Sequence, residues 1–95
     1  MSAYLIARVE VTDWDKYKEY MKLTPDLVKA FGGRFISRGG DLTTLEGEEE
    51  TRRVVMLEFD SVDDAKAFYH SEGYQTAVKA REGAANAQFI IVDGI

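Results

Sequence analysis

Four segments of the chain have the residue types of a β-strand, and side chains two residues apart along them share a face. These segments are residues 3–11, 33–38, 52–59 and 87–94. In the first, Leu5, Ala7 and Val9 share one face, and in the third, "RRVVMLEF", the odd-numbered Val, Leu and Phe do the same. Each of these two strands therefore has a face suited to a core. The third is the clearest of the four strands and is expected at the centre of a sheet.

The second strand is short and is bounded by two glycine pairs. Strict alternation places Arg34, Ile36 and Arg38 on one of its faces. Glycine offers no side chain to pack, so the second pair is expected to break or bulge the strand. The strand is then expected to resume at "LTTLEG", residues 42–47, before a polar turn over residues 47–51.

Residues 13–31 show the three-to-four-residue spacing of an amphipathic helix. Thr12 or Asp13 is in position to cap its first turn, and Gly32 is expected to end it. Pro25 lies inside the segment. Because proline lacks an N–H and its ring crowds the preceding turn, we expect a kinked helix or two abutting helices.

A second helical segment, residues 61–83, contains a break. Ser61 is in position to cap its start, with Asp64 three residues further on. The apolar pattern is interrupted at "HSEG", where Ser71 is in position to cap a new helical stretch that Gly83 ends. We therefore expect one helix in two pieces.

The element order is β-α-β-β-α-β, which predicts an α+β, ferredoxin-like fold. Its four-stranded antiparallel sheet is expected to carry two kinked helices on one face. A doubly wound parallel sheet is disfavoured, because strands two and three are joined by a short hairpin. At 95 residues the chain is expected to form a single domain, 1–95.

Two helices cover only one face of such a sheet. The other face carries Ile6, Val54 and Met56, and exposed apolar area of this kind usually marks an interface. Stacking the faces of two copies would bury it, so we expect a homodimer, a dimeric α+β barrel. The alternative is a monomer with a mixed, solvated face on which Arg8 and Glu58 pair across adjacent strands.

Composition narrows the classes of partner and chemistry. The chain has no cysteine, one histidine and a formal net charge of −5, which argues against disulfides, multi-histidine metal sites and nucleic acid. No apolar run approaches the roughly 20 residues of a membrane span, and the glycine pairs match no nucleotide-binding motif. We expect no metal, no cofactor, no nucleic-acid or membrane partner, and a cytoplasmic location.

Arg38 and Arg81 are the strongest candidates for ligand binding. A guanidinium group binds carboxylate, enolate or phenolate oxygens through paired hydrogen bonds and stays charged when partly buried. If both reach the cleft between sheet and helices, Tyr17 and Tyr74 could line that cleft and donate hydrogen bonds. The structural alternative for Arg81 is an interaction with the C-terminal end of its helix.

Arg38 and Glu46 also have a structural alternative. Arg38 could form a salt bridge to Glu46 or Glu58. Glu46, near the hairpin, could act as a general base if it were buried. Otherwise it is a structural carboxylate that binds Arg38 or Arg53.

The catalytic candidates are weaker: His70, Tyr17 and Glu46. His70 has an ordinary pKa near neutrality, so it could be a general base; it could also be a single axial haem ligand, although its place at a helix break indicates a surface residue. Ser71 beside it is a candidate ligand-binding residue. Helix capping accounts for Ser71 better than a nucleophilic role, since no third member of a catalytic triad is evident.

Taken in order, these stretches resemble a known family. "VTDWDKYKEY", "GGRFISRGG", "LEG", "RRVVMLEF" and "FYHSEGYQ", with the late Arg81, resemble domain-of-unknown-function family 1330 of the dimeric α+β barrel superfamily. The resemblance covers almost the whole chain. The family's motif positions fall here on Asp13, Tyr17, Tyr20, Gly33, Arg38, Gly39, Glu46, Gly47, Arg53, Glu58, Ser71, Tyr74 and Arg81. His70 departs from the small polar residue that the family pattern has there.

The resemblance implies a fold but no single reaction, because the superfamily includes cofactor-independent monooxygenases, isomerases, haem enzymes and proteins without known activity. One hypothesis is a protein that binds a small organic acid, or an oxygenated or aromatic metabolite, between sheet and helices and could carry out cofactor-independent chemistry of the monooxygenase or isomerase kind on it. The other is a non-catalytic dimeric binding or accessory module. Arginines among tyrosines favour the first, and the absence of a complete catalytic motif favours the second.

Overall fold

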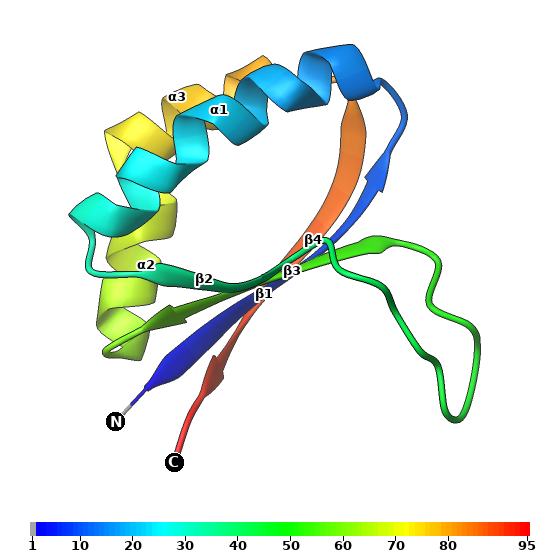
Figure 1. Ribbon diagram of the computed structural model, residues 1–95. Helices are drawn as coiled ribbons and strands as arrows, with labels where there is room; N and C mark the ends of the chain where they lie inside the picture. Colours follow the sequence, from blue (N-terminus) through cyan, green and yellow to red (C-terminus); the bar gives the residue numbers. More distant parts are fainter. Residues whose placement is uncertain (1) are drawn as a thin grey trace.

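The computed structural model, which describes residues 2–95, is one antiparallel sheet covered on a single face by helices (Figure 1). The sheet order is β2-β3-β1-β4, which confirms the ferredoxin-like α+β fold. The elements are β1 (Ala3–Val11), α1 (Trp14–Ala30), β2 (Arg34–Arg38), β3 (Arg53–Phe59), α2 (Val62–His70), α3 (Glu72–Ala80) and β4 (Ala85–Asp93). There are three helices among these residues, because the second helical segment forms two separate ones.

α1 is a single helix that contains Pro25, so the alternative of two abutting helices is wrong. Asp13 caps its start by accepting a hydrogen bond from the backbone N–H of Lys16 at 3.2 Å. Gly32 follows its end with a φ of +75°, the left-handed conformation that glycine adopts without strain. Pro25 is accommodated because the carbonyl it leaves without a helical donor, that of Met21, finds other donors.

Ser71 makes the break between α2 and α3, as expected. Its hydroxyl donates to the carbonyl of Phe68 at 2.7 Å and accepts from the N–H of Tyr74 at 3.1 Å. One side chain thus ends α2 and begins α3. Ser61 caps the start of α2 by accepting from the N–H of Asp64 at 3.0 Å.

β2 departs from the alternation predicted for it. The pairing with β3 shifts register between Phe35 and Ser37, so that Phe35 lies opposite Leu57 and Arg38 lies opposite Val55. A β-bulge of this kind turns the following residue onto the other face of the sheet. Arg38 therefore faces the helices with Phe35, and the prediction that it shares a face with Arg34 is wrong.

The strand does not resume after its second glycine pair. Residues 39–52 form a long loop without strand structure, contrary to the expectation for "LTTLEG". Figure 1 shows this loop (green) extending beyond the sheet on the side away from the helices. It carries Leu45, which is 93% exposed, and Leu42.

The core lies between the sheet and the helices. Its largest fully buried side chains are Tyr74, Phe59, Phe68, Leu5, Val9 and Val28. Of the residues predicted for the inner faces of β1 and β3, those buried in the core confirm the prediction: Leu5, Ala7, Val9, Leu57 and Phe59. None of the helices in the described part of the chain combines the length and apolar character that crossing a membrane requires.

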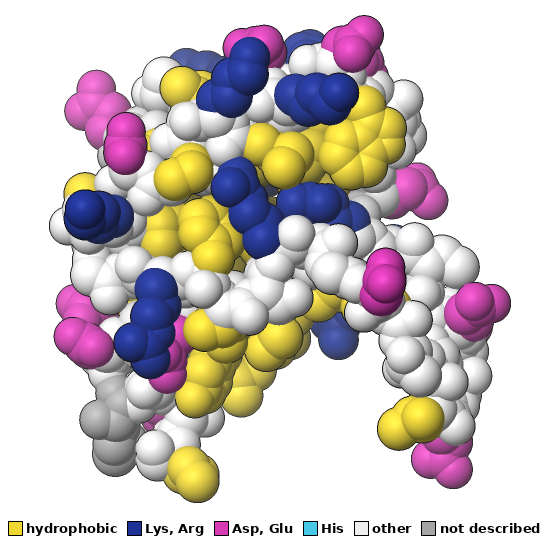
Figure 2. All heavy atoms as spheres, in the orientation of Figure 1, with side chains coloured by type: hydrophobic (Ala, Val, Ile, Leu, Met, Phe, Trp, Pro, Cys, Tyr) yellow, Lys and Arg dark blue, Asp and Glu magenta, His cyan; other side chains and the backbone are white. Residues whose placement is uncertain are grey.

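The outer face of the sheet is apolar and uncovered by any described element. Figure 2 shows a group of hydrophobic side chains beneath the sheet, and Ile36 and Val92 are 45% and 44% exposed. Arg8 does not pair with Glu58: it forms an ion pair with Glu50 at 3.2 Å. Glu58 pairs instead with its cross-strand neighbour Arg34.

Candidate functional site

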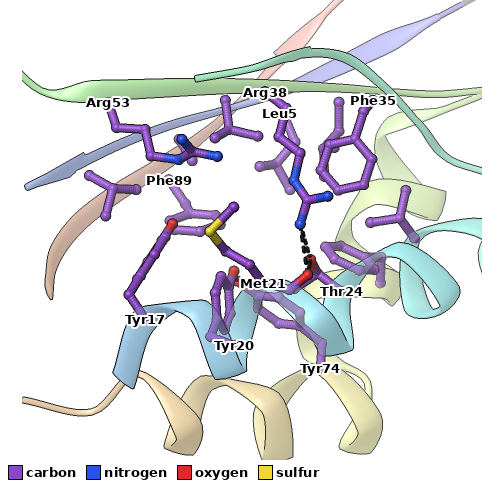
Figure 3. Close-up of a pocket in the computed structure, with 16 residues that line it drawn as sticks. Leu5, Tyr17, Tyr20, Met21, Thr24, Phe35, Arg38, Arg53, Tyr74 and Phe89 are labelled. Carbon is purple, nitrogen blue, oxygen red and sulfur yellow. Dashed lines mark hydrogen bonds between the residues drawn. The ribbon is translucent and has the colours of Figure 1, made fainter. Parts of the chain in front are cut away.

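A pocket that we call the front pocket lies between α1 and the inner face of the sheet (Figure 3). Tyr17, Met21 and Thr24 of α1 form one side, and Arg38 of β2 and Arg53 of β3 form the other. The free space inside is about 30 Å³, room for about two water molecules. A larger ligand enters only if side chains at the opening move.

Arg38 crosses the opening of the front pocket. Its Nη2 donates to the carbonyl oxygen of Met21 at 2.7 Å and lies 3.4 Å from the Thr24 hydroxyl (Figure 3). The Met21 carbonyl is available because residue 25 is proline and has no N–H to offer it. The guanidinium also lies over the ring of Phe35, 4.6 Å from its centroid. Arg38 therefore links β2 to α1 by donating to the carbonyl oxygen that Pro25 leaves without its helical donor.

This link leads to a double-mutant prediction. Arg38→Ala should cost about 1 kcal/mol of unfolding free energy in the natural sequence, and less in a Pro25→Ala background, because alanine supplies the missing N–H to the Met21 carbonyl. Urea denaturation of the four variants measures the coupling. Arg34→Ala, on the outer face of the same strand, is the control whose cost should not depend on residue 25. Equal costs of Arg38→Ala in both backgrounds would contradict the assigned link.

Arg53 and Tyr17 face each other inside the front pocket (Figure 3). The Nε of Arg53 is buried without a hydrogen-bond partner. Burial raises the pKa of the Tyr17 phenol, although the charges of Arg53 and Arg81 lower it. Tyr17 is consequently a neutral hydroxyl near neutral pH, suited to donating a hydrogen bond to an anion rather than to removing a proton.

A buried pair of tyrosines forms the wall behind the front pocket. The hydroxyls of Tyr20 and Tyr74 are hydrogen-bonded at 2.6 Å. Burial raises the pKa of both phenols, and for Tyr20 the neighbouring Tyr74 raises it further. Arg81 stacks against this wall, with its guanidinium 5.0 Å from the ring centroid of Tyr20 and 5.4 Å from that of Phe89.

The tyrosine pair predicts alkaline destabilisation. In the unfolded chain a tyrosine ionises near its ordinary pKa of 10.0, whereas in the folded chain the pKa is higher, so the stabilising contribution is complete below pH 10 and declines as pH rises above it. The Tyr20→Phe/Tyr74→Phe variant should lose roughly 1.5 kcal/mol less than the natural chain between about pH 8 and pH 10.5. Urea denaturation at both pH values tests this. Equal losses would show that other groups cause the decline.

A second cavity, which we call the rear groove, lies between α2, the end of α3 and β4. It has a free volume of about 480 Å³. It is lined by Leu5, Lys66, Tyr69, His70, Arg81, Ala87, Phe89 and Ile91. Leu5 and Phe89 also line the front pocket, so the two cavities share one apolar wall.

The structure thus separates the residues that the sequence suggested for one cleft. Arg38, Tyr17 and Tyr74 line the front pocket, whereas Arg81 and His70 line the rear groove. Ser71 serves as a helix cap and lines neither cavity. Glu46 is exposed in the loop and contacts neither Arg38 nor Arg53 as an ion pair within residues 2–95. Over the same residues, no group of side chains is arranged to hold a metal ion.

Arg53 is the site residue that sequence reasoning missed. It was placed among the family's motif positions but not in the pocket. Extending the alternation of Val55, Leu57 and Phe59 by one step would have turned Arg53 inward. Gly39 carries a second signal: a Cβ added there would lie 2.1 Å from Nη1 of Arg53, so glycine at this position leaves room for the guanidinium.

The six arginines fall into two sets. On the outer side of the sheet, Arg8 and Arg52 form ion pairs with Glu50, and Arg34 pairs with Glu58. The inner set, which we call the inner arginines, contains Arg38, Arg53 and Arg81. No carboxylate of the described chain lies within ion-pair distance of the inner arginines. A chain with a net charge of −5 thus keeps three unpaired positive charges between sheet and helices.

The sheet order and the single layer of helices define the class of protein: a small α+β chain with the ferredoxin-like fold. A family model described as a domain of unknown function, DUF1330, matches residues 2–95. The chain belongs to the DUF1330 family. No curated protein matches the sequence.

Solved structures share the fold at low sequence identity. A protein of unknown function from Rhodopseudomonas palustris has a TM-score of 0.76 and 18% identity, covering 99% of this chain and 82% of that one. SnoaB, a cofactor-independent oxygenase from Streptomyces nogalater, has a TM-score of 0.69 and 10% identity, covering 99% and 93%. A dimeric ferredoxin-like protein of unknown function from Thermobifida fusca has a TM-score of 0.65 and 17% identity, covering 99% and 92%.

Proposed function

We propose that this chain binds a small organic anion, a carboxylate on an oxygenated or aromatic body, in the front pocket between sheet and helices. The observation that carries the proposal is that the two inner arginines lining this pocket, Arg38 and Arg53, have no carboxylate partner. Arg53 is half-buried, whereas Arg38 is exposed. A partly buried charge is costly unless it is paired, and an arginine whose internal partner is missing is ready to bind an external one. Compared with Arg38, Arg53 is the better candidate for binding the anion, because its Nε is buried and has no hydrogen-bond acceptor.

The geometry gives each front-pocket residue a role. Arg53 binds the anion, and the neutral Tyr17 hydroxyl beside it donates a further hydrogen bond. Arg38 releases the Met21 carbonyl to admit the ligand and then binds it as a second guanidinium. The apolar part of the ligand packs against the aromatic and aliphatic side chains that line the pocket on the side of the core. Tyr20 and Tyr74, joined by their hydroxyls, form the wall behind the pocket.

We further propose that two copies associate through the outer face of the sheet. The apolar outer face is the surface that such an assembly would bury, and the Thermobifida fusca protein of the same fold is described as dimeric. The front pocket lies on the opposite side of the sheet. Each protomer of the dimer therefore keeps its own pocket open.

Binding without catalysis is the function that the front pocket supports best. None of its lining residues in the described chain is Asp, Glu or His, so it offers no side chain with an ordinary pKa near neutrality for general acid–base work. A second candidate is cofactor-independent chemistry on an oxygenated aromatic acid. The arginines would stabilise the phenolate or enolate form of such a substrate, and the fold likeness to a cofactor-independent oxygenase is compatible with it.

The test is a calorimetric titration of the full chain with salicylate, an aromatic carboxylate with one hydroxyl. Salicylamide, which has the same shape without the charge, should bind at least about tenfold more weakly. Arg53→Gln should weaken salicylate binding by a similar factor. Arg52→Gln, the neighbour already paired with Glu50, should leave it unchanged. If Arg53→Gln and Arg52→Gln bind salicylate with equal affinity, the front pocket is not the anion site.

A further inference from the structure

Beyond the front pocket, we infer that the rear groove is a second, separate binding site for an amphipathic monocarboxylate with a medium-length alkyl chain. It does not rest on the function proposed for the front pocket, because the two cavities have different arginines. The rear groove already has a free volume of about 480 Å³, within the range of natural ligand pockets. A ligand can therefore enter it without displacing Arg38.

One side of the rear groove is cationic. Lys66 and His70 come from α2, and Arg81 follows α3. The Nε of Arg81 is buried and has no hydrogen-bond partner. No carboxylate of residues 2–95 lies within ion-pair distance of Arg81 or Lys66, and no acidic residue lines the groove. The missing counterion is an anion supplied from outside.

The opposite side of the groove is apolar and elongated. Ala87, Phe89 and Ile91 are alternate residues of β4, so they follow one another along the same face of the strand, and Leu5 lies beside them across the β1–β4 pairing. From Ala87 to Ile91 the strand rises roughly 14 Å. An extended alkyl chain of about eight carbons fits within that length, whereas a compact dianion would leave the apolar side unused.

An amphipathic ligand whose carboxylate binds Arg81 thus matches both sides of the groove. The anionic head meets the helix side of the groove, where Lys66 adds positive charge beside Arg81 and His70 offers an imidazole N–H as a hydrogen-bond donor. The alkyl chain lies along β4 against Phe89 and Ile91. Because the groove is on the helix side of the sheet, stacking of the outer faces would leave it accessible.

The experiment uses octanoate, octanol and butanoate as probes, titrated into the full chain and followed by heteronuclear NMR. Octanoate should shift the resonances of Lys66, His70, Ala87 and Ile91. It should bind at least about tenfold more tightly than octanol, which lacks the charge, and at least about tenfold more tightly than butanoate, which lacks the chain length. Octanol binding as tightly as octanoate, or shifts centred on Arg53 instead, would overturn the assignment.

Variants separate the two sites. Arg81→Gln should weaken octanoate binding at least about tenfold. If it does not fold, Lys66→Glu should weaken binding about threefold, with Lys18→Glu, exposed on α1, as the matched control. Ala87→Phe, at an exposed position of β4, should fill the groove and abolish octanoate binding. Arg53→Gln should leave octanoate binding unchanged while it weakens salicylate binding, so either site can fail without the other. Octanoate affinity that survives both Arg81→Gln and Ala87→Phe would refute the rear site.

Discussion

Replacing Met56 by lysine is expected to convert the proposed dimer into a monomer. Met56 lies near the middle of the outer face, opposite Ile6 of β1 and Ser37 of β2. In a two-fold assembly the substitution appears on both sides of the interface, and each lysine ammonium would be buried without a partner. The dissociation constant should rise at least about a hundredfold.

Sedimentation equilibrium over a range of concentrations measures this change. Thr76→Lys, which adds the same charge on the exposed side of α3, is the matched control and should stay dimeric. Far-UV circular dichroism and a urea midpoint close to that of the natural chain would establish that the Met56 variant is folded. A Met56→Lys protein that is as dimeric as the control would place the interface elsewhere.

The second large effect is expected at Gly39. Its φ is +72°, a conformation that costs a residue with a Cβ about 1 to 2 kcal/mol, so Gly39→Ala should destabilise the fold by that amount. The added Cβ would also occupy the place of the Arg53 guanidinium. Arginine is flexible enough to move away, and the consequence is the loss of Arg53 from the front pocket. Salicylate binding should fall at least about tenfold.

Gly47 offers a matched control for the backbone contribution. Its φ is +84°, and a Cβ there would meet no atom within 4 Å. Gly47→Ala should therefore cost a similar amount of unfolding free energy, measured by urea denaturation, and leave salicylate binding unchanged. If the two alanine variants bind salicylate equally well, Gly39 does not position Arg53.

Much of the fold follows from local patterns. The alternation in β1 and β3 identified their buried faces, because the period of a strand is two and one face must enter the core. Ser71 and Gly32 marked helix boundaries through capping, which depends on neighbours a few residues away. Pro25 left two alternatives open for α1, and local pattern could not choose between them, since one of the donors that compensate for its missing N–H comes from Arg38 on another element.

The candidate site was only partly predictable. Arg38, Arg81, Tyr17 and Tyr74 were singled out from the sequence, and all four line a cavity. Their division between two cavities was not foreseen, and Arg53 was overlooked. The separation depends on how α1 and α3 pack over the sheet, and no pattern within a single element contains that information.

The sequence by itself determined the order of the elements and the inner faces of the two central strands. It also determined that apolar side chains lie on the outer face of the sheet, which the helices do not cover. Each of these depends on residue types at short, regular spacings. Only the tertiary structure decided which arginines are paired. The bulge in β2 turned Arg38 inward, and register set Arg34 beside Glu58 while leaving Arg53 and Arg81 without a carboxylate. Pairing of charges is a matter of distance between elements, and that distance exists only once the sheet and helices are assembled.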